Sequence, residues 1–409
     1  MKTGISFIFL FLSLALCSQK QAKQGIWRGV LILSAEKNTE LPFNFEIKQT
    51  AGKTQLVIHN AEERITVTEI VAKKDSFNFK MPAFDSEFKC QLIGDTLLKG
   101  VWLNHSRTEK NKILFTAVYG DANRFVLSPN PSNVLFEGKW EITFSANTKD
   151  SSKAIGLFTH SKGSNCIQGT FLTETGDYRY LEGVVHDGII YLSCFDGAHA
   201  FLFTAEHKGS EITNGHFYSG SHWEEPWVGK RNDAFQLRNA ETITHLKSEH
   251  EKVNFTFNNL SDKKISINDL RYKNKPVIIQ IMGSWCPNCL DETAYLTEIY
   301  NTYSKQGLEI IALCYERTND LNKAKNNITR FKTKCNAQYE FLISGSSNKD
   351  KASESLAFLN KVSAFPTTIV LDKNHTVKTI YTGFSGPATG NEYEVFKTKF
   401  EASVKDLVK

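Results

Sequence analysis

Apolar and polar side chains alternate with a period of two through most of the first half of the chain. Examples are Phe43-Asn44-Phe45-Glu46-Ile47, Ile65-Thr66-Val67-Thr68 and Phe77-Asn78-Phe79. Glycine, aspartate and asparagine recur between such runs every eight to fifteen residues, as they do at turns between short strands. Helical spacing is absent from residues 25–235. The pattern predicts antiparallel β structure for this region.

The β-rich region repeats itself. Gly25-Ile26-Trp27 corresponds to Gly138-Lys139-Trp140, and Ala83-Phe84-Asp85 corresponds to Cys194-Phe195-Asp196. The offset stays between 111 and 115 residues, which indicates a duplication. We therefore expect two similar β-sandwiches or open barrels. Repeat 1 covers residues 25–128, repeat 2 covers 134–235, and residues 129–133 form the linker.

The pattern changes after residue 250, where apolar runs alternate with helical spacing. Such alternation indicates an α/β sheet. A redox domain over residues 250–409 is predicted. The expected strands are 255–260, 265–270, 277–281, 308–313, 339–343, 367–371 and 378–382, and the expected helices are 290–304, 321–335, 352–359 and 392–408.

Residues 1–17 have the composition of an export signal. Lys2 gives a positive start, and residues 5–16 form an almost unbroken apolar run that is too short to span a bilayer. Leu14-Ala15-Leu16-Cys17 resembles a bacterial lipoprotein processing site, in which Cys17 is lipidated. Leu16 departs from that pattern, so ordinary cleavage nearby is the alternative. We expect a location in the cell envelope or periplasm, with membrane contact only through a lipid on Cys17.

Composition narrows the function classes. The net charge of +5 is spread out without an arginine-rich run, so nucleic-acid binding is not expected. Six of the eleven histidines lie between His160 and His222, but their spacing matches no recurrent metal motif. Aromatic residues such as Trp223 and Trp227 leave open a ligand for the β-rich half, although aromatics on strands are more often core.

Two cysteines carry the candidate chemistry. The apolar run 277–281 leads into Gly283-Ser284-Trp285, and Cys286 and Cys289 follow with two residues between them. A Cys-x-x-Cys at a strand-to-helix junction is the thioredoxin-type redox motif. We expect Cys286 to face solvent at a helix N-terminus, where unpaired N–H groups and the helix dipole favour its thiolate. Cys289 is expected beneath it, and Pro287 suits the first helical turn.

The remaining cysteines are harder to assign. A zinc site would need a second pair of similar spacing, which the sequence lacks. We expect Cys90 and Cys314 to be buried thiols because both lie in apolar strands. The pairing of Cys166, Cys194 and Cys335 stays open, since connectivity does not follow from sequence.

Pro366 lies at the start of the predicted strand 367–371. Proline cannot donate into a central ladder, so it belongs at the first residue of a strand or at a bend. A cis peptide there would hold a turn facing the cysteine pair and leave backbone groups of Phe365 for an extended substrate. We expect Trp285, Pro287 and Phe365 to contact the substrate.

Residues 253–409 resemble the TlpA/ResA-type thioredoxin-fold disulfide reductases of the bacterial envelope. The matching segments are VNFTFNNLSDKKISINDL, KPVIIQIMGSWCPNC and FPTTIVLD. The resemblance implies that Cys286 is the attacking thiol, Cys289 the resolving thiol and Pro366 the cis-proline. It also implies that Glu292 is the acid that tunes thiol pKa or moves protons; the alternative is an exposed first-turn glutamate.

This sequence departs from the family at two places. Gln280 stands where thioredoxins carry a buried aspartate, so any proton acceptor must be Glu292 or water. The turn before Trp285 is Met282-Gly283-Ser284 instead of the usual aromatic-alanine turn. The expected fold class is an α/β thioredoxin fold at the C-terminus, preceded by an all-β, internally duplicated N-terminal half.

The predicted function is that of an exported thiol–disulfide oxidoreductase that reduces protein disulfides through a mixed disulfide. It needs no cofactor or metal, and by resemblance its electrons come from a membrane thiol donor. Three alternatives stay open: a disulfide oxidase or isomerase, a peroxidase with a lone reactive cysteine, and an envelope protein whose β-rich half binds a ligand or partner.

Overall fold

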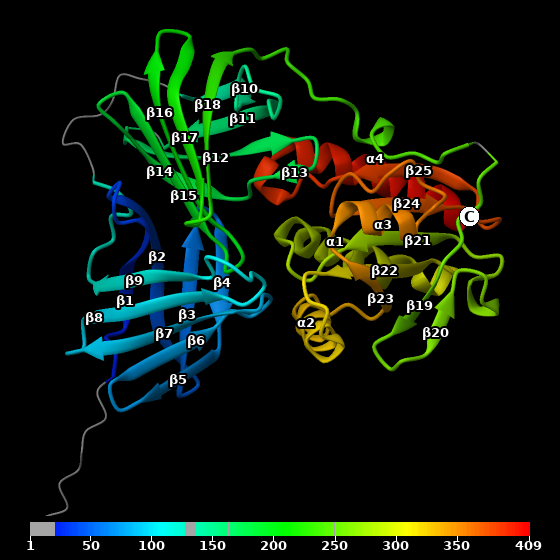
Figure 1. Ribbon diagram of the computed structural model, residues 1–409, viewed down its shortest axis with the longest axis horizontal. Helices are drawn as coiled ribbons and strands as arrows, with labels where there is room; N and C mark the ends of the chain where they lie inside the picture. Colours follow the sequence, from blue (N-terminus) through cyan, green and yellow to red (C-terminus); the bar gives the residue numbers. More distant parts are fainter. Residues whose placement is uncertain (1–20, 127–135, 162, 249) are drawn as a thin grey trace, which may run out of the picture.

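The structure is a computed structural model that describes residues 21–126, 136–161, 163–248 and 250–409. The predicted signal with Cys17, and the predicted linker 129–133, lie outside the described residues. Two β-rich units lie beside a mixed α/β domain (Figure 1). Among the described residues, no helix combines the length and apolar character needed to cross a membrane.

The first unit is one antiparallel sheet in the order β4-β3-β2-β1-β9-β8-β7-β6-β5. Its alternating apolar positions form a core that includes Trp27, Phe43, Phe88 and Phe115. The end strands β4 and β5 belong to a single sheet that stays open between them. The strands are β1 (Gly25–Ser34), β2 (Thr39–Thr50), β3 (Lys53–Asn60), β4 (Glu63–Val67), β5 (Glu69–Lys73), β6 (Ser76–Lys80), β7 (Ser86–Ile93), β8 (Leu97–Asn104) and β9 (Lys112–Tyr119).

The second unit has a similar strand order but closes on itself. Its sheet runs β11-β10-β18-β17-β16-β15-β14-β12-β13, and β11 also pairs with β12. Trp140, Phe171, Phe203 and Trp227 fill its interior. The strands are β10 (Gly138–Phe144), β11 (Ser152–His160), β12 (Cys166–Thr173), β13 (Gly176–Asp177), β14 (Leu181–His186), β15 (Ile189–Phe195), β16 (Ala200–Lys208), β17 (Glu211–Ser219) and β18 (Trp223–Arg231).

Equivalent tryptophans begin the two units in the same way. The indole N–H of Trp27 donates to the carbonyl oxygen of Lys23 at 2.9 Å, and that of Trp140 donates to the carbonyl oxygen of Phe136 at 2.7 Å. In each unit the first strand pairs with the last, β1 with β9 and β10 with β18. The repeat in the sequence therefore corresponds to a repeat in the topology.

The third sheet has the order β20-β19-β23-β22-β21-β24-β25. β21 is parallel to β22 and antiparallel to β24, and every residue of β21 is buried. The elements are β19 (Thr256–Asn259), β20 (Lys264–Ser266), β21 (Val277–Met282), α1 (Pro287–Tyr303), β22 (Glu309–Glu316), α2 (Leu321–Lys334), β23 (Glu340–Ser346), α3 (Lys349–Ser355), β24 (Thr367–Leu371), β25 (Val377–Thr382) and α4 (Asn391–Val408).

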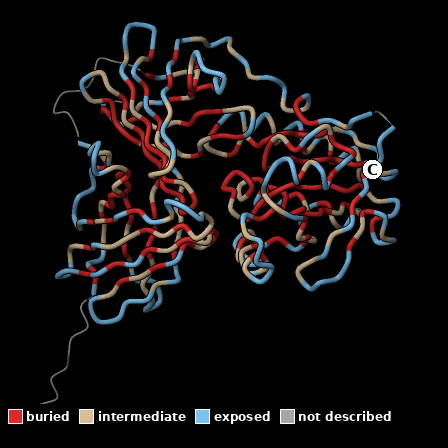
Figure 2. The backbone as a smooth tube through the Cα atoms, in the orientation of Figure 1, coloured by how far each residue is buried: buried red, intermediate tan, exposed pale blue. Residues whose placement is uncertain are grey.

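This order and the helices that connect the strands make a thioredoxin fold, and the predicted fold class is confirmed. The expected strand 265–270 is shorter than predicted, since β20 ends at Ser266, and two predicted helices differ from their expected bounds by three residues or more. α1 begins at Pro287, three residues earlier than expected, because Cys286 acts as its N-cap. α3 begins at Lys349 because Asn348 caps it, and it ends at Ser355, before the expected end at 359. Buried residues gather within each unit and along the face where the α/β domain meets the β units (Figure 2).

Candidate active site

The first turn of α1 positions Cys286. Its backbone is extended, its sulfur accepts a hydrogen bond from the backbone N–H of Cys289 at 3.2 Å, and Pro287 occupies the first helical position. Serine and aspartate oxygens fill this capping role in other helices. A thiolate at this place interacts favourably with the positive end of the helix dipole.

Cys286 lies beside the proline turn of the neighbouring strand. The peptide bond between Phe365 and Pro366 is cis, and the Cys286 thiol donates to the carbonyl oxygen of Phe365 at 3.4 Å. The expectation that Cys286 faces solvent is wrong, because the residue is only 5% exposed. The sequence interpretation treated the end of α1 as free, whereas the β-rich half packs against Pro287 and Asn288.

Cys289 is fully buried within the α/β core. Burial first, and its contact with Cys286 second, raise the pKa of the Cys289 thiol well above its ordinary value. A thiol in this environment stays protonated until a base removes its proton.

A carboxyl group lies buried behind the pair. Glu292 is 2% exposed, so the alternative of an exposed first-turn glutamate is wrong. Its two oxygens accept from the Gln280 amide at 2.8 Å and the Thr368 hydroxyl at 2.7 Å. Gln280 is itself held by the Thr293 hydroxyl, which donates to its oxygen at 3.0 Å. Burial raises the pKa of Glu292 to about 7, although both hydrogen bonds act in the opposite direction.

The turn that precedes the cysteines is fixed by a second buried acid. Glu316 accepts from the backbone N–H of Ser284 at 2.9 Å and from its hydroxyl at 2.6 Å. Gly283 is required here, because a Cβ at that position would lie 2.3 Å from the Trp285 indole nitrogen. Sequence reasoning missed Glu316, whose signal is a carboxylate that ends the apolar strand β22.

Trp285 is half-buried beside Cys286. Its indole N–H donates to the carbonyl oxygen of Tyr315 at 2.9 Å, and its ring meets that of Phe365 edge-on at 5.7 Å. Arg317 is an exposed residue, and its guanidinium carbon lies 3.9 Å from the centre of the indole ring. Sequence reasoning did not identify Arg317 as a neighbour of the site. The expected substrate residues Trp285 and Phe365 therefore lie together, whereas Pro287 is buried under the β-rich half.

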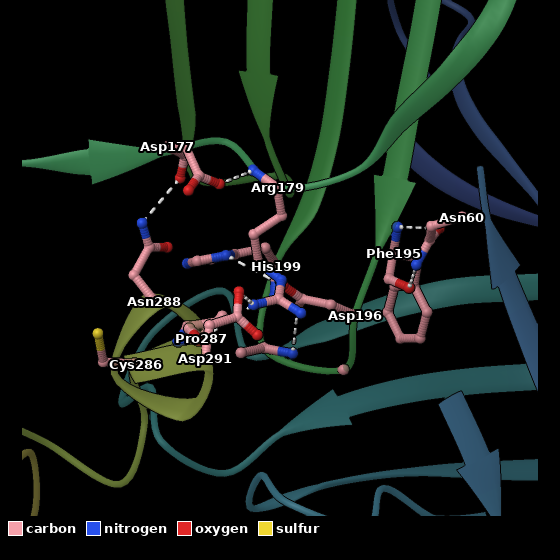
Figure 3. Close-up of polar contacts among 12 residues, drawn as sticks. Asn60, Asp177, Arg179, Phe195, Asp196, His199, Cys286, Pro287, Asn288 and Asp291 are labelled. Atoms are coloured by element: carbon pink, nitrogen blue, oxygen red, sulfur yellow. Dashed lines mark hydrogen bonds and ion pairs between the residues drawn. The ribbon is translucent and has the colours of Figure 1, made fainter. Parts of the chain in front are cut away.

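The β-rich half contributes residues that no local motif announced. Arg179, in the loop after β13, donates to the carbonyl oxygen of Pro287 at 3.1 Å, and the Asn288 amide donates to the carbonyl oxygen of Asp177 at 3.1 Å (Figure 3). Both residues between the two cysteines are therefore held by another part of the chain.

The other cysteines in the described part of the chain are free thiols. Cys90 and Cys314 are buried in strands, as expected, and Cys166, Cys194 and Cys335 are also free. No group of three or more metal-binding side chains is found among the described residues. In the β-rich half Trp227 is core, whereas Trp223 is 53% exposed.

Comparison with known proteins places the C-terminal region. Residues 249–380 match the sequence model of the AhpC/TSA family. The chain is 30% identical over 129 residues to the thiol-disulfide oxidoreductase ResA of Geobacillus thermodenitrificans, covering 32% of this chain and 66% of that protein. It is 32% identical over 112 residues to ResA of Geobacillus kaustophilus, covering 27% and 57%. A crystal structure of a DsbF homologue from Corynebacterium diphtheriae aligns at 21% identity with a TM-score of 0.29, covering 40% of this chain and 98% of that one.

The chain spans less than two thirds of the length of either ResA protein. The predicted resemblance of the C-terminal region to thiol–disulfide oxidoreductases is confirmed, and these relatives are enzymes by name. The β-rich half precedes the region that matches the family model.

Proposed function

We propose that the protein is a thiol–disulfide oxidoreductase whose Cys286/Cys289 pair reduces disulfides in other proteins. One observation carries the proposal. The Cys286 sulfur caps α1, accepts from the Cys289 N–H at 3.2 Å and lies 3.4 Å from the carbonyl oxygen of Phe365. A nucleophilic thiol, a second thiol and the backbone of the cis-proline turn thereby occupy one small region.

The first step is attack by the Cys286 thiolate on one sulfur of a substrate disulfide. The substrate S–S bond breaks, a mixed disulfide forms with Cys286, and the leaving substrate thiolate takes up a proton. Trp285 and Phe365, whose rings meet edge-on, form the apolar border against which the substrate segment lies.

The second step is attack by Cys289 on the sulfur of Cys286. It releases the second substrate thiol and leaves a Cys286/Cys289 disulfide, so that two electrons have passed to the substrate. Because burial raises the pKa of Cys289, this step needs a base. Glu292, with a pKa of about 7, has the proton affinity suited to this role near neutral pH.

Turnover with and without each cysteine tests the proposal. Cys286→Ser should abolish reduction of a protein disulfide such as that of insulin, and Cys289→Ser should accumulate the mixed disulfide, seen as a mass increase lost on reduction. Cys335→Ser, a half-buried free thiol, is the matched control and should retain activity. Full activity of Cys286→Ser would refute the proposal.

The direction of electron flow is tested separately. A reduction potential of about −270 mV for the pair would suit a reductase that a membrane thiol donor supplies, whereas a value of about −120 mV would suit a disulfide oxidase.

Residues 1–17 support export to the cell envelope. Labelling with a radioactive fatty acid, with and without Cys17→Ser, tests lipidation. If substitutions in the β-rich half leave the rate of disulfide reduction unchanged, a separate ligand-binding role for that half is favoured.

A further inference from the structure

The loop that follows β13 forms hydrogen bonds with the turn between the two cysteines. Arg179 donates to the carbonyl oxygen of Pro287 at 3.1 Å. The Asn288 amide donates both to the carbonyl oxygen of Asp177 at 3.1 Å and to that of Phe384 at 3.3 Å. The Cys286 thiol itself is directed away from Arg179 (Figure 3). The loop therefore contacts Pro287 and Asn288 of the Cys-x-x-Cys turn and not the Cys286 sulfur.

Arg179 joins all three parts of the chain. Its guanidinium pairs with Glu63 of the first β unit and Asp291 of α1, and it lies 3.5 Å from Asp196 of the second β unit. The residue is 3% exposed and its backbone has φ +58°, a left-handed conformation that an arginine rarely adopts. The three carboxylates around this buried guanidinium restrict the position that the Arg179 side chain can take.

The backbone of the loop also approaches the redox turn closely. Gly176 has φ +139°, which side chains rarely tolerate, and a Cβ there would lie 2.3 Å from the side-chain amide nitrogen of Asn288, so the position favours glycine. The Asp177 carboxylate accepts from the N–H of Gly386 in the α/β domain at 2.5 Å and from the N–H of Arg179 at 2.6 Å. These contacts attach the loop both to the turn between the cysteines and to Gly386 of the α/β domain.

A second contact uses the counterpart of Asp196 in the first repeat. Asp85 lies 3.2 Å from the Lys323 ammonium of α2 and 3.8 Å from the Arg330 guanidinium. The preceding Phe84 packs with Ala198 and Leu290 of α1. Asp85 and Asp196, the aspartates of the duplicated Phe-Asp motif, thus both lie at the boundary with the α/β domain, whereas Phe195 packs in the core of the first β unit. A cavity of about 190 Å³ at this boundary is lined by Phe84, Arg179, Asp196, Leu290 and Asp291.

We propose that Arg179 is a positioning residue that links the redox state of the Cys286/Cys289 pair to docking of the β-rich half, an inference that rests on the proposed function. Oxidation removes two electrons and two protons, forms the S–S bond and eliminates the thiol that donates to Phe365. In this proposal, closing the S–S bond between Cys286 and Cys289 shifts the turn at Pro287 and Asn288. The docked loop holds that turn in its dithiol geometry, so docking favours the dithiol, and by reciprocity oxidation weakens docking.

The reduction potential of the full-length chain tests this link. The pair is equilibrated with reduced and oxidised glutathione, which accepts the two electrons, and the disulfide fraction is read from alkylation and mass spectrometry. In Arg179→Gln the equilibrium constant for disulfide formation should rise at least about tenfold, which is a potential lower by about 30 mV. Arg179→Lys, which keeps the charge but loses the planar fork, should give an intermediate value.

Arg124→Gln is the matched control. Arg124 is also a buried arginine of the β-rich half, and it donates to His59, Ser193 and Glu182 within that half. A general loosening of the β units would move both variants alike, whereas the proposed link moves only Arg179→Gln. An unchanged potential in Arg179→Gln, a more oxidising one, or an equal shift in Arg124→Gln would overturn the proposal.

A charge-neutral pair covers the case in which Arg179→Gln does not fold. Gly176→Ala introduces the clash with Asn288, whereas Gly188→Ala, also at positive φ in the second β unit, meets nothing within 4 Å. Only Gly176→Ala should lower the potential, and equal behaviour of the two would refute the link. If the wild-type chain reduces insulin but the variants leave the reduction potential unchanged, the proposed function is retained and the link is rejected. If the wild-type chain does not reduce insulin, both are rejected.

Discussion

The buried carboxyl of Glu292 makes the stability of the α/β domain depend on pH in an unusual direction. Burial raises its pKa to about 7 from an ordinary value of 4.5. The folded chain therefore keeps this proton over a pH range in which the unfolded chain has lost it. Because the folded state then binds more protons, the free energy of unfolding falls as pH rises from about 4.5 to about 7 and levels off above. A difference of about 2.5 pKa units corresponds to a loss of about 3 kcal/mol.

Glu292→Gln should remove this slope. The neutral amide has the shape of the protonated acid and can still accept from Gln280 or meet the hydroxyl of Thr368, its two present partners. The difference in stability between the variant and the wild type should therefore grow by about 3 kcal/mol between pH 4.5 and 7. Measuring hydrogen exchange only at the backbone amides of β21 and β24 restricts the comparison to the α/β sheet.

Native-state hydrogen exchange followed by mass spectrometry supplies the measurement. Exchange of the amides of β21 and β24 gives the opening free energy of this sheet at each pH. Glu298→Gln, at an exposed position of the same helix, is the control and should follow the wild-type curve. Parallel curves for Glu292→Gln and wild type would show that Glu292 titrates near its ordinary value, and would refute its proposed role as a base poised near neutral pH.

Two further predictions concern Glu292 and the first β unit. Thr368→Val removes a hydrogen bond to the Glu292 carboxylate, and such a bond to a charged acceptor is worth about 1.5–3 kcal/mol. The pKa of Glu292, followed by infrared titration of its protonated carboxyl, should therefore rise by about 1–2 units. An unchanged pKa would contradict the hydrogen-bond network. Phe43→Ala empties a buried site where the ring stacks on Phe195 of the second unit at 4.7 Å, and exchange of the β2 amides should show a loss of about 3–5 kcal/mol, whereas a loss below about 1 kcal/mol would mean that the core refills.

Local pattern was sufficient for the elements and for the cysteine pair. Alternation with a period of two depends only on neighbouring residues, and so do the apolar run of β21 and the glycine turn before Trp285. The cysteine spacing likewise places both thiols on the first turn of one helix. Recognition of the fold class and of the redox motif therefore needed no tertiary information.

Burial and long-range contacts could not be predicted from local pattern. The sequence suggested that Cys286 faces solvent, and it left open whether Glu292 is exposed or buried. Both are decided by segments distant in the chain, since Thr368 lies 76 residues from Glu292 and Arg179 lies 108 residues from Pro287. The two β repeats look alike in sequence, yet one sheet stays open and the other closes through the pairing of β11 with β12.

Spacing along a few residues was enough to predict most strands and helices and to single out the Cys286/Cys289 pair. The surroundings of those two thiols depend on the tertiary structure. The pKa of Glu292 and the arginine that holds the Cys-x-x-Cys turn result from burial and from pairing among three separate units. Desolvation and ion pairing depend on distances in space, which local patterns of residue type do not specify.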